Sequence, residues 1–338
     1  MWLLARELER LGGVAQTVVT GTGTELARRL RSDGVTVREV PWRIGLDPRV
    51  CGTILTALRG SAALLHAHDG HAVILAGLCA SLAGRPFIAT RRVAFHLRHR
   101  GYWARATRVI AVSQAVASVL AEDGIPPERI SIVHSGIALE LALESQPLGV
   151  RPRLGLAPDA QIVAGVGSLE PEKDHATLFR AAKVLEARHP SLHWVLAGAG
   201  RQRPVLERLR DELGLGNKIH LLGQVDEPLG LIADANVFVM SSRDEGLGTS
   251  VLDAMALGIP IASTSAGGVP EMLADGAGLL VPPGDPVALG AAVSQILDDC
   301  ALRRSLTENA RVAVRRFSAD RMAAEVRNVY RSCAHFLD

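Results

Sequence analysis

Short runs of β-branched and apolar residues alternate with segments whose apolar positions recur about every 3.6 residues. Strand–helix alternation of this kind predicts parallel sheets that carry helices on both faces. In the first half of the chain the pattern predicts strands at Val14–Thr20, Ala62–His66, Pro86–Thr90, Thr107–Val112 and Ile130–His134, and helices at His71–Ala83 and Gln114–Asp123.

The polar segment from Glu140 to Asp159 contains proline and glycine, interrupts the alternation and predicts a linker. The alternation then resumes, with strands predicted at Gln161–Val166, Leu192–Ala197, Ile219–Leu222, Asn236–Met240, Ile259–Thr264 and Gly278–Val281, and helices at His175–His189, Arg203–Leu213, Ser250–Leu257, Asp285–Asp298 and Ala301–Phe317. We therefore expect an α/β protein of two doubly wound, Rossmann-like domains that face each other across a cleft. The expected bounds are 1–145 and 146–318, and a last helix in 319–338 is expected to cross back to the first domain.

The chain opens on a helical pattern where such a domain normally has a strand. Leu3, Leu4, Leu8 and Leu11 share one face of a predicted helix, which Gly12-Gly13 ends. A doubly wound domain normally begins with a strand and a glycine-rich turn. We therefore expect the first strand of the first domain to be missing, either because the chain starts late or because the domain is built without it.

Composition narrows the class of protein. Apolar residues make up 48% and charged residues 21% of the 338 residues, which fits two soluble domains and excludes a disordered chain. Lys+Arg is 37 and Asp+Glu is 35, so the net charge of +2 argues against a nucleic-acid partner. The four cysteines form no C-x-x-C pair, and no apolar run is long enough to span a bilayer. We expect a cytoplasmic protein without a metal site.

Two glycine-containing loops follow predicted strands in the second domain. Gly165-Val166-Gly167-Ser168-Leu169-Glu170-Pro171-Glu172-Lys173 combines glycines, which let backbone N–H groups approach an anion, with a lysine. This loop is as compatible with a structural turn as with a phosphate site. Gly198-Ala199-Gly200-Arg201 also combines glycines with a basic residue after a predicted strand. A plain strand-to-helix turn is the favoured interpretation there.

The strongest motif runs from Ser241 to Gly258. A strand is followed by an acidic, glycine-rich loop and then by an alanine-rich helix that Gly258 closes. Amides near Gly248 lie at the start of that helix, where the dipole and the unpaired donors favour a phosphate. Glu245 and Asp253 can each accept hydrogen bonds from hydroxyls of a sugar. The alternative is a solvated loop with a helix cap.

The residues from Glu245 to Gly258, continued by Pro260, Thr264, Gly267-Gly268, Pro270-Glu271 and Gly278-Leu279-Leu280-Val281-Pro282, resemble the donor site of retaining glycosyltransferases of family GT4 (glycosyltransferase group 1). These proteins have the GT-B fold. The resemblance implies that Glu245 lies near the donor hexose, Asp253 on the ribose hydroxyls and Lys173 on the diphosphate. The implied donor-binding set is Gly167, Ser168, Lys173, Gly198, Arg201, Val225, Gly246, Leu247, Gly248, Thr249, Ser250 and Asp253.

Three positions depart from the family pattern. Asp253 replaces the usual glutamate, and Ser168 stands where an arginine is common. In Thr90-Arg91-Arg92, the arginine at 92 takes the place of a histidine that faces the reaction centre in many members. An arginine cannot act as a base, but it can stabilise a leaving diphosphate.

His68 and Asp69, at the end of the preceding strand, then become candidates for acceptor contact, whereas His66 is equally well a core histidine. The catalytic candidates are Glu245, Arg92, His68 and Asp69.

The segment Arg91–Arg108 is basic and aromatic. It holds six arginines with Phe95, Tyr102 and Trp103, and it contains no acid. One interpretation is a surface that contacts anionic lipid headgroups at the inner face of the membrane, or a phosphorylated acceptor. The other is a solvated basic helix that lines the cleft.

These features predict a hexosyltransferase that moves a sugar from a nucleotide-diphospho-sugar to a glycan, lipid or lipopolysaccharide-type acceptor in cell-envelope glycan biosynthesis. Retention at the anomeric carbon and independence of metal and cofactor are implied by the resemblance. The alternative is a non-catalytic or acceptor-impaired nucleotide-sugar-binding protein, because the first strand and its loop are absent. An epimerase on the same fold is less favoured, because Glu245 and Asp253 match the transferase pattern better.

Overall fold

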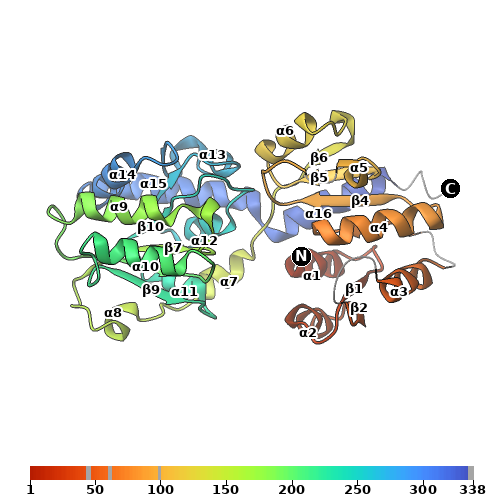
Figure 1. Ribbon diagram of the computed structural model, residues 1–338, viewed down its shortest axis with the longest axis horizontal. Coiled ribbons are helices and arrows are strands. Elements are labelled where there is room, and N and C mark those ends of the chain that lie inside the picture. Colours follow the sequence, from red (N-terminus) through yellow and green to blue (C-terminus); the bar gives the residue numbers. More distant parts are fainter. Residues whose placement is uncertain (43–46, 60–62, 98–99, 334–338) are drawn as a thin grey trace. The chain divides into compact units, whose positions relative to one another are not determined.

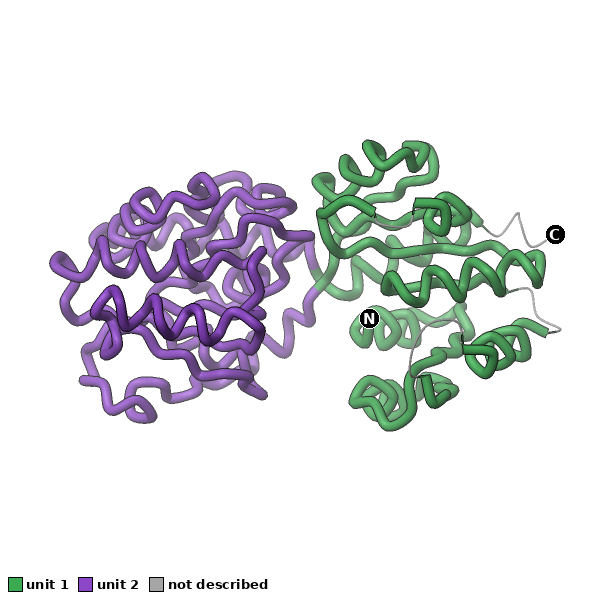
Figure 2. Tube along the Cα trace, viewed as in Figure 1, with its two compact units in different colours: residues 1–136, 318–338 green, residues 137–317 purple. Residues whose placement is uncertain are grey.

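The computed structural model describes residues 1–42, 47–59, 63–97 and 100–333. The chain forms two compact units, one of Met1–Gly136 with Ser318–Asp338 and the other of Ile137–Phe317 (Figure 2). The first unit thus ends before the expected bound of 145. The reason is that α7 (Leu139–Glu144), which falls in the expected linker, packs on α12 (Thr249–Leu257) of the second unit.

The second unit contains a single parallel sheet of six strands in the order β12-β11-β10-β7-β8-β9. Figure 1 labels β10, β7 and β9 of this sheet among the surrounding helices. Its strands are β7 (Gln161–Val166), β8 (Leu192–Ala197), β9 (Ile219–Gly223), β10 (Val237–Met240), β11 (Ile261–Thr264) and β12 (Leu279–Val281). Besides α7 and α12, its helices are α8 (Val150–Arg153), α9 (His175–Leu185), α10 (Arg203–Glu212), α11 (Pro228–Ala233), α13 (Val269–Met272), α14 (Pro286–Asp298) and α15 (Cys300–Ala313). It also contains the short 3-10 turns η2 (Pro171–Lys173), η3 (Ala274–Gly276) and η4 (Val314–Phe317).

The strands of the second unit bury both faces, which explains their nearly continuous apolar runs. Val163 of β7 packs into a core shared with α9 and α14, whereas its neighbour Ile162 packs into a second core with α8 and α11. Successive side chains alternate between the two faces, as the pleat of a strand requires. The sheet is therefore held rigidly between two helical layers, and its strand ends can position loops.

The first unit contains two separate parallel sheets, β1-β2 and β3-β4-β5-β6. Its strands are β1 (Thr17–Gly21), β2 (Thr36–Val40), β3 (Leu65–Ala67), β4 (Phe87–Arg91), β5 (Arg108–Ala111) and β6 (Ile130–Ile132). Its helices are α1 (Trp2–Leu11), α2 (Glu25–Ser32), α3 (Pro48–Leu58), α4 (Gly70–Ala83), α5 (Arg100–Trp103), α6 (Gln114–Glu122) and α16 (Ala319–Ser332), with the 3-10 turn η1 (Pro127–Arg129). The described chain thus begins with a helix, as its leucine pattern predicts.

The last helix belongs to the first unit. Met322 and Val326 of α16 share a buried cluster with Leu4 and Leu8 of α1, which also includes Ile88 of β4. The entry to α16 is tight, because a Cβ at Gly136 would lie 2.5 Å from the Ser318 carbonyl oxygen. The two ends of the described chain are thus packed together in one core.

Candidate functional site

The strand order of the second unit reverses between the neighbouring strands β7 and β10. The chain runs from β7 outward to β8 and β9 on one side, and then returns to β10, β11 and β12 on the other. In doubly wound sheets, ligands bind outside the carboxyl ends of the strands where this reversal occurs. The two motifs singled out from the sequence are the loops that leave β7 and β10 at this point.

Backbone and side-chain hydrogen bonds join these two loops. The Arg243 amide donates to the Glu172 carbonyl at 2.8 Å, and the Ser241 hydroxyl donates to the Lys173 carbonyl at 3.0 Å. The Arg243 Nε donates to Asp174 Oδ2 at 2.7 Å. Asp174 adopts φ +42°, one of two positive values among the described non-glycine residues. Sequence reasoning missed Glu172, Asp174 and Arg243, because their roles depend on contact between distant segments.

Two glycines allow neighbouring loops to stack without space between them. At Gly267, with φ +51°, a Cβ would lie 1.6 Å from the carbonyl oxygen of Glu245. At Gly198, with φ +150°, a Cβ would lie 1.8 Å from the carbonyl oxygen of Gly167. The absence of a side chain therefore lets the loop after β11 pack directly against Glu245, and the loop after β8 pack directly against Gly167.

Glu245 and Lys173 form an ion pair across the two loops. Their side chains are only 12% and 20% exposed, and the Ser242 hydroxyl also donates to Glu245 at 3.3 Å. The ammonium group assigned to the diphosphate is therefore paired with the carboxylate assigned to the hexose.

Asp253 lies on α12, and its carboxylate has no ion-pair or side-chain hydrogen-bond partner among the described residues. Burial raises the pKa of Asp253 to about 7. Buried carboxylates with strongly shifted pKa values are concentrated at functional sites. α12 also begins at Gly248 without a side-chain cap, and amides at the start of such a helix can bind an anion. The helix thus offers an anion site at its start and a hydroxyl acceptor one turn later.

The remaining donor-site candidates differ in their exposure and in the residues that they contact. Arg201 is held by Glu170, to which its Nε donates at 2.9 Å, and its side chain is 83% exposed. The Ser168 carbonyl contacts the buried ring of His175 at 3.1 Å. Val225 packs at the edge of the α8–α11 core. The loop and helix start that contain Gly246, Leu247, Thr249 and Ser250 directly follow β10, between Glu245 and Asp253.

The first-unit candidates lie at the ends of β3 and β4. His66 is satisfied on both ring nitrogens, by the Tyr330 hydroxyl at 2.7 Å and the Thr90 hydroxyl at 2.6 Å, which makes it a structural core histidine. The Asp69 carboxylate caps α4 through the amides of His71 and Ala72. Arg92 donates a hydrogen bond to the Ser135 hydroxyl at 3.4 Å, and the His68 ring lies 4.0 Å from that of His66; both residues are discussed below.

The basic segment Arg91–Arg108 is tied down within the first unit; Arg98 and His99 lie outside the described residues. Its helix α5 is a single turn, with Trp103 buried and the Arg91 guanidinium above its ring at 5.4 Å. The side chain of Asp123 is fully buried and accepts hydrogen bonds from the Leu97 amide at 2.6 Å and from Arg100 at 2.7 Å. An acid from outside the segment therefore neutralises part of its charge.

We expect Asp123→Ala to destabilise the protein by about 2 kcal/mol, because it leaves the buried Leu97 amide unpaired. Burial opposes ionisation of Asp123, but hydrogen bonds from Leu97 and His96 and the charge of Arg100 outweigh it and lower its pKa. The stabilisation should therefore be complete above the unfolded pKa, about 3.9, and disappear as the pH falls through the folded value. Urea unfolding would measure the free energy of unfolding and its dependence on pH. The rate of tryptic cleavage after Arg100 would measure how firmly the segment is held. Asp211→Ala, at a 63% exposed side chain, should change neither.

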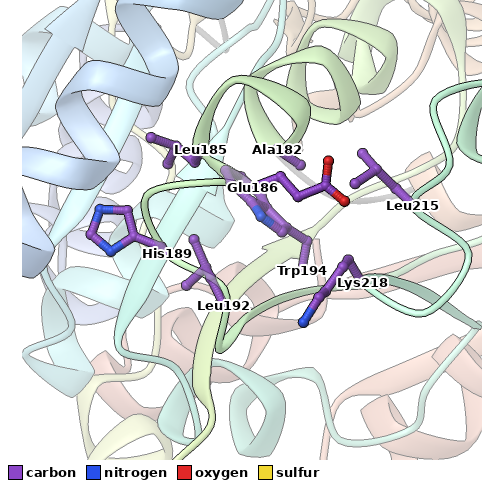
Figure 3. A pocket seen from close by; sticks show the side chains of 8 residues that line it. All are labelled: Ala182, Leu185, Glu186, His189, Leu192, Trp194, Leu215 and Lys218. Atoms are coloured by element: carbon purple, nitrogen blue, oxygen red, sulfur yellow. The ribbon is translucent and has the colours of Figure 1, made fainter.

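A small hollow in the second unit does not coincide with this site. Figure 3 shows its lining, which comes from the end of α9, the start of β8 and the residue before β9: Ala182, Leu185, Glu186, His189, Leu192, Trp194, Leu215 and Lys218. These positions lie at the amino ends of the strands, so the hollow is on the opposite edge of the sheet from the loops after β7 and β10. It has no part in the proposed chemistry.

In residues 1–42, 47–59, 63–97 and 100–333, no group of three or more histidine, cysteine, aspartate or glutamate side chains is arranged to hold a metal ion. In the same ranges no helix has the length and apolar character needed to cross a bilayer.

Solved structures support the fold assignment. HepE of Anabaena, solved in complex with UDP, superimposes with a TM-score of 0.83 at 20% identity over 98% of this chain and 96% of that one. A glycosyltransferase of Rickettsia africae gives 0.84 at 19% identity over 98% and 93%. Sucrose-phosphate synthase of Thermosynechococcus elongatus gives 0.76 at 22% identity over 97% and 91%. The two units therefore have the GT-B fold.

Sequence comparisons identify the family. D-inositol 3-phosphate glycosyltransferase of Thermobispora bispora is 32% identical over 61% of this chain and 51% of its own length. An uncharacterized glycosyltransferase of Methanocaldococcus jannaschii is 32% identical over 66% of this chain and 60% of its own. The chain thus spans only part of the length of these relatives. The model for "Glycosyltransferase Family 4" matches residues 1–141, and that for "Glycosyl transferases group 1" matches 150–313. The chain belongs to the group 1 glycosyltransferases of family 4.

Proposed function

We propose that this protein transfers a sugar from a nucleotide-diphospho-sugar to an acceptor with retention at the anomeric carbon. The observation that carries the proposal is the ion pair of Lys173 and Glu245 in the loops after β7 and β10, followed on α12 by the partly buried Asp253, at the strand reversal of a doubly wound sheet. A hydroxyl-rich, anionic ligand satisfies all three groups together. The UDP and UDP-glucose complexes of the structural neighbour HepE favour a uridine nucleotide.

In the proposed mechanism the donor unit positions the sugar and stabilises the leaving group. Asp253 accepts hydrogen bonds from the ribose hydroxyls, and the first amides of α12 bind the diphosphate. Lys173 leaves Glu245 for the departing phosphate, where a cation lowers the energy of the developing charge. Glu245, released, accepts a hydroxyl of the hexose. No strong base is assigned, so positioning and charge stabilisation carry the reaction.

The proposed acceptor belongs to the cell envelope. Two relatives from Rhizobium meliloti are named lipopolysaccharide core biosynthesis glycosyltransferases, one of them 35% identical over 47% of this chain and 46% of its own length. The inositol phosphate named for other relatives is likewise a polyhydroxylated, charged acceptor. We propose a glycan, lipid or lipopolysaccharide-type acceptor met at the cytoplasmic side of the membrane.

A panel of nucleotides tests the donor site first. Saturating ligand at about 100 times its Kd should raise the unfolding temperature by roughly 5–10 °C. We expect this shift with UDP and a smaller one or none with GDP, ADP or dTDP. If no nucleotide shifts the transition, the donor-site assignment is wrong. A shift without any sugar transfer or donor hydrolysis would instead identify a nucleotide-sugar-binding protein. NMR of a transferred sugar then reports whether the anomeric configuration is retained.

A further inference from the structure

Arg92 brings a positive charge into the first unit without a carboxylate to balance it. The residue follows β4, and its side chain is partly buried. Its Nη1 donates to the Ser135 hydroxyl at 3.4 Å, and among the described residues it forms no ion pair. Burial lowers the pKa of Arg92, but a guanidinium stays protonated in proteins. A charge held in this way is costly until an anion reaches it.

His68 lies beside this charge with an unused ring nitrogen. Its ring rests against that of His66, with 4.0 Å between the centroids, and its Nδ1 is buried without a hydrogen-bond partner. Burial, His66 and Arg92 together lower the pKa of His68 well below the usual value, so the ring is neutral. His66 cannot supply a partner, because both of its own nitrogens are taken.

The position of these groups is that of a ligand site. His68 follows β3, Arg92 follows β4 and Ser135 follows β6, so all three leave the carboxyl ends of one parallel sheet. That edge is where doubly wound sheets bind ligands. An oxyanion is the ligand chemistry that fits, because it accepts hydrogen bonds from the guanidinium, the hydroxyl and an imidazole N–H. A cation would be repelled, and an apolar group would leave these donors unpaired.

We propose that Arg92, His68 and Ser135 form an oxyanion site in the first unit, and that it binds the phosphate or carboxylate group of the sugar acceptor. The assignment to the acceptor rests on the proposed function. The diphosphate of the donor already has its partners in the second unit, namely Lys173 and the start of α12. The site would therefore select charged acceptors over neutral ones.

The test uses inorganic phosphate as the probe and the full chain as the protein. Thermal unfolding is measured with increasing phosphate, against sodium chloride at the same ionic strength. We expect a rise of several degrees in the wild-type protein and in Lys173→Gln, which alters the donor site only. Arg92→Gln should lose the rise. Without phosphate, its unfolding temperature should equal or exceed that of the wild type, because the uncompensated charge is gone. Arg92→Lys, which keeps a charge, should retain a smaller rise.

Several results would overturn this proposal. A phosphate effect no larger than that of chloride removes the site. An effect that persists in Arg92→Gln, or that disappears in Lys173→Gln, places the phosphate elsewhere. If saturating UDP abolishes the Arg92-dependent effect, the anion bound there is the diphosphate of the donor and the acceptor assignment is wrong. The shift produced by UDP alone reports on the donor site, so a failure of the proposed function is distinguishable from a failure of this one.

Discussion

Asp253→Asn should make the free protein more stable and the nucleotide complex weaker. In the unfolded chain an aspartate titrates near 3.9, whereas burial raises the pKa of Asp253 to about 7 in the folded protein. Between these values the folded state keeps a proton that the unfolded state releases. Stability therefore falls as the pH rises from about 4 to about 7. Above that range the folded state carries a partly buried carboxylate that has no ion-pair or side-chain hydrogen-bond partner among the described residues.

The gain from Asp253→Asn should accordingly appear only at high pH. An amide does not ionise, so at pH 8 we expect the variant to be more stable by about 2 kcal/mol, after allowance for partial exposure of the side chain. Near pH 4 the two proteins should unfold alike. Urea unfolding at both pH values measures the difference. A variant less stable than the wild type at pH 8 would show that the carboxylate already has a stabilising partner.

Nucleotide binding should respond in the opposite direction. The ribose hydroxyls donate to an ionised carboxylate, and losing hydrogen bonds to a charged group weakens binding by about 10- to 100-fold. Wild-type affinity for UDP-glucose should fall as the pH drops from 8 to 6, because Asp253 must release its proton to bind. Asp253→Asn should be weak and indifferent to pH. UDP-glucose is preferred to UDP here, because a terminal phosphate titrates near pH 6. Asp211→Asn is the matched control.

Gly267→Ala should be among the most damaging single changes in the second unit. The backbone at Gly267 has φ +51°, which costs a residue with a side chain about 1–2 kcal/mol. The added methyl would also lie 1.6 Å from the Glu245 carbonyl oxygen, so one of the two loops must move. Together these effects should destabilise the protein by about 3 kcal/mol. The displaced Glu245 loop should also bind nucleotide-sugar more weakly.

Gly214→Ala separates the two causes. Gly214 has φ +71°, yet nothing lies within 4 Å of a Cβ built there. It should therefore show the backbone cost alone, about 1–2 kcal/mol, and bind donor normally. Equal losses of stability in the two variants, with unchanged donor binding in both, would mean that the contact between Gly267 and Glu245 does not position the site.

Much of the fold could be predicted from the sequence, because strands buried on both faces have conspicuous apolar runs. Gln161–Val166 and Leu192–Ala197 were predicted with the bounds the structure has. The region between β1 and β3 was not predicted in detail. α2 buries only Ala27 and Leu30 among charged neighbours, and β2 carries Arg38 and Glu39, so neither segment shows a clear apolar pattern.

The candidate site was only partly predictable, for a different reason. Motif spacing identified the loops after β7 and β10 and the carboxylates of Glu245 and Asp253. It could not show that Lys173 pairs with Glu245, because this contact depends on the order of the strands. His66 and His68 are chemically identical and two residues apart. Only the fold distinguishes them, by bringing Tyr330 to His66 from 264 positions away.

Hydrogen–deuterium exchange of the full chain with and without UDP-glucose tests the central claim most directly. If the donor binds at the strand reversal of the second unit, protection should appear in two segments, residues 165–174 and 241–253. The hollow at the opposite edge of the sheet, around Trp194 and Lys218, should exchange as before. Protection confined to that hollow, or binding of UDP-glucose without protection of either loop, would contradict the account.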